Sequence, residues 1–106
     1  MNLREYQAFT PTTAVYPAER ELEYLALGLA SEAGEVAGVV KKWIRDGAAP
    51  PVVADKIAAE LGDVCWYLAQ LCNATGLDLE AVFAANMKKL QDRKARGVIA
   101  GSGDNR

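Results

Sequence analysis

Two pairs of carboxylates in this sequence have the residue type and the spacing of a metal-binding site. Glu32 and Glu35 lie three residues apart, and Glu60 and Asp63 repeat that spacing further along the chain. Three residues is just under one turn of an α-helix, so the members of each pair share a helix face if both stretches are helical. Two neighbouring helices could then present four carboxylates to one site.

The neighbours of these carboxylates are apolar, which is unusual for charged side chains. At helical spacing, Glu32 and Glu60 lie in line with Leu25, Leu29, Val36 and Val39, and with Ile57, Val64 and Tyr67, respectively. Burying an unpaired charge is costly, and converging carboxylates raise one another's pKa unless a cation lies between them. The alternative is that both pairs lie on solvated faces, with Lys56 forming a surface ion pair with Glu60.

The sequence contains no histidine. This excludes Ser-His and Cys-His nucleophilic machinery, histidine-ligated zinc, and the Glu-x-x-His pattern of ferritin-like di-iron bundles. A metal must therefore be held by oxygen ligands, which points to Mg²⁺ or Mn²⁺. Because magnesium held by carboxylates commonly binds substrate phosphates as well, we expect a phosphate-bearing substrate and positive groups nearby.

Candidate phosphate-binding residues follow both acidic pairs. Lys42 lies seven residues after Glu35 on the same helix face, and Asn86, Lys89 and Arg93 form one polar stripe near the end of the last predicted helix. Asn86 takes a position where the apolar face of that helix should continue. Pairing with the helix dipole, together with solvation, also explains a basic helix end. The acidic pairs upstream favour the binding interpretation for Asn86 and Lys89.

The recurrence of apolar residues at three and four predicts four helices and no strand. We expect them at residues 2–9, 19–45, 52–75 and 79–96, in an all-α, four-helix bundle-like domain of residues 1–97 with a disordered tail at 98–106. The predicted inward positions are Leu22, Leu25, Leu29, Val36, Val39, Trp43, Ile57, Leu61, Val64, Leu68, Leu71, Cys72, Leu79, Val82, Phe83, Met87 and Leu90.

The composition is that of a soluble globular protein. The chain has 106 residues, 51% of them apolar and 25% charged, which suits one core and argues against disorder. A net charge of −2 gives no general attraction to nucleic acid, and there is neither an apolar run long enough to span a bilayer nor a signal-like start. We expect a cytoplasmic protein that binds neither nucleic acid polymers nor membranes.

Cys65 and Cys72 are expected to be small buried residues in a reducing compartment. Two turns of one helix separate them by about 10 Å, which is too far for a disulfide. Gly28, Gly34, Gly38 and Gly62 lie inside predicted helices near the acidic pairs, although glycine there costs up to about 1 kcal/mol relative to alanine. Either they let two helices approach closely enough to share metal ions, or they serve ordinary tight packing.

Four motifs in this order resemble those of the MazG-like nucleotide pyrophosphohydrolases, of the all-α NTP pyrophosphatase superfamily. They are Ser31-Glu32-Ala33-Gly34-Glu35, Glu60-Leu61-Gly62-Asp63-Val64-Cys65-Trp66-Tyr67, Gly76-Leu77-Asp78-Leu79-Glu80, and Asn86-Met87-Lys88-Lys89-Leu90 with Arg93. The resemblance covers roughly residues 20–96. Ser31 stands where many members have a first glutamate, as in the dCTP-pyrophosphatase-like branch, and this leaves the set of four carboxylates whole.

The resemblance implies that Glu32, Glu35, Glu60 and Asp63 bind Mg²⁺, and that the chain hydrolyses nucleoside triphosphates to a monophosphate and pyrophosphate. Glu35 or Glu32 would orient or deprotonate the attacking water. The phosphates would be held by Lys42, Asn86, Lys89 and Arg93. The candidates for base contacts are Gln7, Trp43, Trp66 and Tyr67, with core packing as the alternative role for Trp66.

The resemblance also implies a homo-dimer or homo-tetramer with substrate held partly between subunits, and four helices this apolar offer more surface than one small bundle hides. The expected role is clearance of non-standard or excess nucleotides. Two other functions remain open: hydrolysis of a different phosphoanhydride, such as a phosphoribosyl-ATP-like compound, and a non-catalytic helical module that binds nucleotides or a partner.

Overall fold

A computed structural model describes all residues 1–106 and contains four α-helices and no strand. The helices are α1 (Leu3–Phe9), α2 (Glu21–Asp46), α3 (Pro50–Thr75) and α4 (Leu79–Ala95), and two 3-10 turns, η1 (Thr10–Thr13) and η2 (Ala18–Arg20), lie between α1 and α2. The all-α prediction is confirmed, and each helix lies within two residues of its expected range. No helix combines the length and the apolar character that crossing a membrane requires.

Short-range chemistry explains where the helices begin and end. Gly47 and Gly76 adopt left-handed φ angles of 70° and 71°, and they end α2 and α3. Pro50 and Pro51 form the first turn of α3, where proline's missing N–H is not needed. The side chain of Asp78 accepts a hydrogen bond from the backbone N–H of Ala81 and caps α4.

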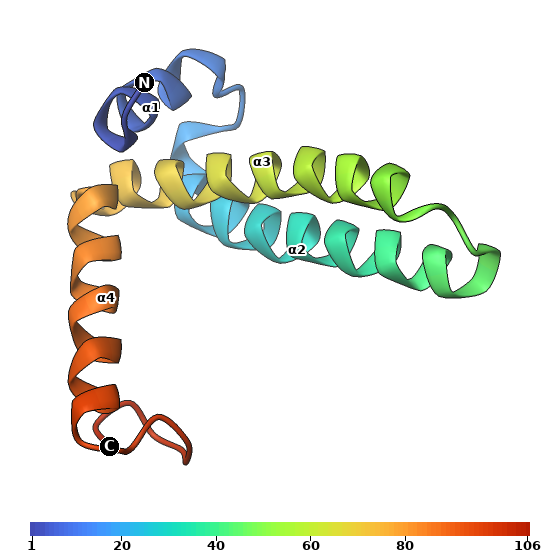
Figure 1. Cartoon of the computed structure of the whole chain (residues 1–106). Helices are drawn as coiled ribbons and strands as arrows, with labels where there is room; N and C mark the ends of the chain where they lie inside the picture. The colour runs from blue at the N-terminus through green and yellow to red at the C-terminus, as the bar shows by residue number, and fades with distance from the viewer.

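The helices form an L rather than a closed bundle. α2 and α3 run antiparallel and side by side as one long hairpin, and α4 turns away from its end (Figure 1). α4 contacts α1 and α3 but not α2. The radius of gyration is 16.7 Å, whereas a compact chain of this length has a radius of about 13 Å.

A buried polar network ties the N-terminal segment to α3. Thr10 is fully buried and its hydroxyl donates to the side-chain oxygen of Gln70 at 2.8 Å. The amide of Gln70 donates to the hydroxyl of Tyr16 at 2.9 Å, and the indole N–H of Trp66 donates to Thr13 at 2.7 Å. These bonds hold residues 10–16 beside the C-terminal half of α3.

The core within one chain is small. Only Leu25, Val53, Ala69, Cys72 and Leu79 are buried apolar residues. Within one chain, the prediction of an inward position is wrong for seven residues, each at least 40% exposed: Leu22, Trp43, Leu61, Val82, Phe83, Met87 and Leu90. The other predicted positions are buried or partly buried. On α4 the L shape causes this exposure, because α4 contacts the hairpin only at its junction with α3 and does not contact α2. Cys65, expected to be buried, is exposed, and neither cysteine forms a disulfide.

Residues 98–106, expected to be a disordered tail, instead fold back onto the last turns of α4. Arg93 donates to the backbone oxygen of Asp104 at 2.6 Å, and Arg96 donates to that of Arg106, also at 2.6 Å. The guanidinium of Arg106 in turn donates to three backbone oxygens of the segment, including that of Gly103. Short-range arginine bonds therefore order a stretch whose small, polar composition predicted disorder.

Candidate metal centre and the cavities beside it

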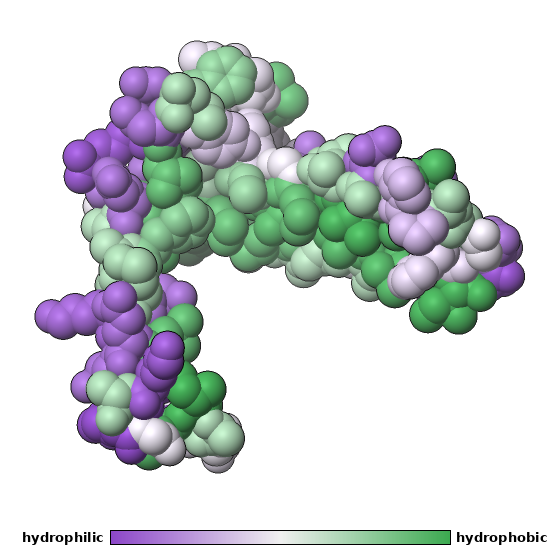
Figure 2. Space-filling view, viewed as in Figure 1, coloured by the Kyte–Doolittle hydropathy of each residue, from purple (hydrophilic) through white to green (hydrophobic).

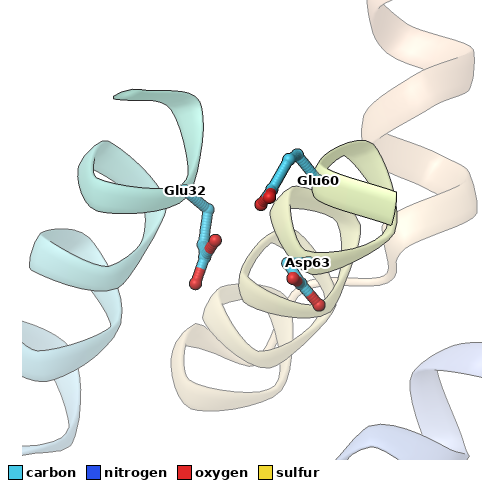
Figure 3. A group of neighbouring side chains, drawn as sticks. All are labelled: Glu32, Glu60 and Asp63. Carbon is cyan, nitrogen blue, oxygen red and sulfur yellow. The ribbon is translucent and has the colours of Figure 1, made fainter. Parts of the chain in front are cut away.

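Three of the four predicted carboxylates converge between α2 and α3. Glu32 extends from α2 toward Glu60 and Asp63 of α3 (Figure 3). One oxygen from each of the three lies within 4.8 Å of the others. Glu32 and Glu60 are partly buried and Asp63 is exposed. The antiparallel hairpin explains the convergence, because it sets the middle of α2 beside the middle of α3.

The electrostatics of this acidic triad (Glu32, Glu60 and Asp63) favour a cation. None of the ion pairs in the structure involves the triad or Glu35, so the expected surface pair between Lys56 and Glu60 does not form. Burial raises the pKa of Glu32, and the charges of Asp63, Glu60 and Glu35 raise it further. Three oxygen ligands without a positive partner fit a hard divalent ion, and the absence of histidine argues against a softer one.

Glu35 lies beside the triad rather than within it. It lines a cavity of 420 Å³ between the two helices, together with Glu60, Lys42 and Trp43. Lys56, which sequence reasoning placed only as a partner of Glu60, lines the same cavity from α3. Neither lysine forms an ion pair within the chain. This lysine cavity therefore places two free ammonium groups next to the carboxylates.

A second cavity adjoins the triad on its other side. Its volume is 340 Å³, and Glu32 and Asp63 line it with an aromatic group: Tyr16, Tyr24, Trp66 and Tyr67. Tyr16 and Tyr24 stack with ring centroids 4.9 Å apart, and Trp66 meets Tyr67 edge-on at 5.0 Å. Burial is the main reason that the pKa of Tyr67 rises to about 12, so its phenol stays protonated at neutral pH.

Sequence reasoning found Trp66 and Tyr67 but missed Tyr16 and Tyr24. A signal for Tyr24 existed, because Tyr24, Gly28 and Glu32 recur at four residues and thus share one helix face. Tyr16 lies in an irregular segment where no periodicity applies. Its position depends on its contact with Gln70, 54 residues further along the chain.

The other two candidates for base contacts lie elsewhere. Trp43 lines the lysine cavity. Gln7 joins α1 to the junction of α3 and α4: its amide donates to Asn73 and to the backbone oxygen of Leu77, and its oxygen accepts from the N–H of Leu79. These bonds engage both the amide and the oxygen of the Gln7 side chain, which does not line the aromatic cavity, and they give it a structural role.

The chain does not bring the predicted phosphate-binding stripe of α4 to the triad. Asn86 lines a 760 Å³ apolar cavity on α4, together with Phe83, Met87 and Ile99. Lys89 and Arg93 contact Asp104 of the folded-back segment. None of the three stripe residues lines either cavity beside the carboxylates, because α4 does not contact α2.

Of the four helix glycines near the acidic pairs, one permits a close approach within the chain. A Cβ atom at Gly28 would collide with the ring of Tyr67, so this glycine lets the aromatic cavity form between α2 and α3. A Cβ atom at Gly34, Gly38 or Gly62 would meet no other side chain or helix within 4 Å. Tight packing of α2 against α3 therefore does not explain those three.

Comparison with known proteins agrees with the geometry. A family model described as the MazG nucleotide pyrophosphohydrolase domain matches residues 20–98, which include α2, α3, α4 and all three triad residues. The chain is 46% identical to the Gene 37 protein of Mycobacterium phage L5 over 114 aligned residues, which cover the whole of both chains. No solved structure matches it. The family match spans most of the chain, and this protein belongs to the MazG nucleotide pyrophosphohydrolase domain family.

Proposed function

We propose that this protein is a magnesium-dependent nucleoside triphosphate pyrophosphohydrolase, which cleaves between the α and β phosphates and releases a nucleoside monophosphate and pyrophosphate. The observation that carries the proposal is the acidic triad: three carboxylates from two helices, with no cationic partner, in a chain of this family. Removal of excess or non-standard nucleotides is the role that we assign to this reaction.

Glu32, Glu60 and Asp63 would hold the metal, with Glu35 beside them as a further ligand or as the base. A bound Mg²⁺, or Mn²⁺ in its place, would polarise the phosphoryl group and neutralise the charge that develops during cleavage. Glu35 is exposed and lies outside the triad, at the edge of the lysine cavity. We therefore assign it, rather than Glu32, to orienting the attacking water and accepting its proton.

The different linings of the two cavities suggest how the substrate is oriented when bound, with its base in one and its phosphates toward the other. The aromatic cavity offers flat apolar surfaces for a base, and Tyr24, Trp66 and Tyr67 line it on the side of the triad formed by Glu32 and Asp63. The lysine cavity lies on the side of Glu60, where Lys42 can bind phosphate oxygens. A triphosphate that spans both cavities would place its α and β phosphates at the carboxylates.

A second copy of the chain would cover apolar surface that one chain leaves exposed. The accessible surface is 7498 Å², roughly 1,700 Å² more than a folded monomer of this mass exposes. Apolar surface runs along the hairpin and over the inner side of α4 (Figure 2). Phe83 and Met87 of α4 are 44% and 58% exposed. An excess of this size is about twice the roughly 800 Å² that one partner buries in a standard interface, and it falls in the range of the larger interfaces of obligate homo-oligomers.

We assign this surface to a homo-dimer or homo-tetramer in which α4 of one copy packs against the hairpin of another. Such packing would bring Asn86, Lys89 and Arg93 toward a partner's acidic triad, which explains why one chain alone keeps them apart. Sedimentation of Phe83→Ser should show dissociation toward monomers. Val15→Ser is the matched control, because Val15 is 93% exposed and lies outside all four helices. A wild-type monomer at micromolar concentration would contradict the assignment.

The reaction is tested by measuring pyrophosphate and monophosphate released from each common ribo- and deoxyribonucleoside triphosphate, with magnesium and with EDTA. We expect the two products in equal amounts, and only with magnesium. Glu35→Gln should lose turnover with little change in metal affinity. Release of orthophosphate would contradict the cleavage position. Stabilisation by nucleotides without any product would support a binding module instead.

A further inference from the structure

The folded-back segment 98–106 places a carboxylate on the two cations of the α4 stripe. Asp104 accepts through one side-chain oxygen from Lys89 at 3.2 Å and from Arg93 at 3.3 Å, and its backbone oxygen accepts from Arg93 at 2.6 Å. The side chain of Arg93 is only 6% exposed, whereas that of Asp104 is 82% exposed. The exposed carboxylate of Asp104 therefore pairs with both the buried Arg93 and Lys89.

Residues 98–106 form a turn that hydrogen bonds from Lys89, Arg93 and Arg96 hold against the end of α4. Gly97 has a φ of 71°, and the N–H of Val98 donates to the backbone oxygen of Arg93 at 2.9 Å, which ends the helix in a Schellman-type turn. Gly101 and Gly103 also have positive φ angles, which permit the reversal that returns Asp104 to the helix.

A phosphate group would compete well for this position. Exposed ion pairs such as that of Lys89 with Asp104 contribute little to stability, because water and salt screen them. A phosphate carries more charge than one carboxylate and offers three acceptor oxygens to the forked guanidinium and the ammonium group. Lys89, followed by Arg93, lowers the pKa of Asp104, so its carboxylate is charged at neutral pH.

The surrounding charges add attraction for an anion. Lys88 and Lys94 lie on the same helix and form no ion pair. Asp92 is occupied by Arg96 at 2.9 Å, four residues later on the same helix. Asp104 is thus the only acid in contact with the Lys89 and Arg93 pair.

We propose that Lys89 and Arg93 form a polyphosphate-binding site that Asp104 fills as a built-in competitor, so that ligand binding must displace the 98–106 segment. This rests on the proposed function insofar as the natural ligand is the phosphate chain of the nucleotide substrate. Binding at this site can be measured apart from hydrolysis, because neither cation contacts the acidic triad within the chain.

The test is calorimetric binding of inorganic tripolyphosphate to the full chain in EDTA, where no hydrolysis can occur and the unneutralised triad repels the anion. We expect Asp104→Asn to bind about two- to five-fold more tightly than wild type, the effect of removing one exposed ion pair. Lys89→Gln should bind about ten-fold more weakly, since a charge-assisted contact is lost. Asp92→Asn is the matched control, because it removes one negative charge from the neighbouring helix α4, where Asp92 pairs with Arg96 and contacts neither Lys89 nor Arg93.

Thermal melts of each variant establish that it is folded. Equal affinity of Lys89→Gln and wild type would overturn the site, and equal tightening by Asp104→Asn and Asp92→Asn would overturn the competitor role in favour of a general charge effect. Absence of tripolyphosphate binding to wild type would overturn both. Failure of the proposed hydrolysis is seen separately with magnesium and nucleotides, and it leaves this measurement unaffected.

In a second measurement, amide NMR signals of Gly101 and Gly103 should shift when tripolyphosphate is added to wild type. The signals of ligand-free Asp104→Asn should already lie near those of the bound state. Signals that stay in place at saturating ligand would show that the segment is not displaced, which contradicts the proposal.

Discussion

Glu32→Gln should stabilise the metal-free protein and destabilise the metal-loaded one. The triad oxygens lie within 4.8 Å of one another. Two unit charges at that separation repel by about 1 kcal/mol even at the dielectric constant of water, and by more near a protein surface. The substitution removes two of the three repulsions. Relaxation and salt reduce the gain, so we expect about 1 kcal/mol, or roughly 5 °C in the melting temperature.

The assay is thermal unfolding at pH 7 and fixed protein concentration, in EDTA and in saturating magnesium. Magnesium at one hundred times its Kd stabilises a folded protein by about 2.7 kcal/mol. Glu32→Gln should gain less stability from magnesium, because it lacks one of the carboxylates that would bind the ion. The order of the two melting temperatures should therefore reverse between the two buffers. Glu19→Gln, an exposed glutamate before α2, is the neutral control.

The pH dependence has a defined sign. The pKa of Glu32 is raised in the folded state, mainly by burial and then by its acidic neighbours, so the folded protein binds more protons than the unfolded chain. The stability that protonated Glu32 contributes is therefore fully present below the ordinary pKa of glutamate. It is lost as the pH rises through the raised pKa of Glu32 in the folded protein. In EDTA, the advantage of Glu32→Gln should shrink as the pH falls toward that range. If Glu32→Gln melts below wild type in EDTA at pH 7, repulsion among the triad carboxylates does not destabilise the metal-free protein.

Two further changes test the framework that positions the site, both by urea unfolding at one protein concentration. Gly28→Ala should lower the free energy of unfolding by about 1–3 kcal/mol because its Cβ meets the Tyr67 ring, whereas Gly34→Ala should raise it by up to about 1 kcal/mol. Shifts in the same direction would contradict this contact. Thr10→Val should cost about 1–2 kcal/mol through its lost buried bond to Gln70, and an unchanged midpoint would show that the bond contributes nothing.

Local sequence signals were sufficient for the helices and for the three carboxylates that converge, whereas Glu35 lies beside them. Gly47, Gly76 and Asp78 act over a few residues, so the ends of the helices follow from residue type alone. Glu32 and Glu60 come together because each lies mid-helix on an apolar face and the connection between the helices is short. An antiparallel hairpin with two such faces has little freedom in how it pairs.

What the sequence could not predict depends on long-range contacts. The direction of α4 is set by a junction that Gln7 helps to build from 72 residues away, and no periodicity encodes it. The aromatic cavity needs Tyr16, which a contact with Gln70 holds in place. Apolar spacing shows that Phe83 requires a partner surface, but it does not tell whether that surface belongs to the same chain.

The role of the acidic triad is tested most directly by phosphorus NMR of a nucleoside triphosphate incubated with magnesium and either wild type or Asp63→Asn. Asp63 is exposed, so its substitution should leave the fold intact while removing one triad oxygen. We expect pyrophosphate and monophosphate signals that grow together with wild type and nearly vanish with the variant. Equal turnover by the two proteins would show that the acidic triad between α2 and α3 is not the site of the reaction.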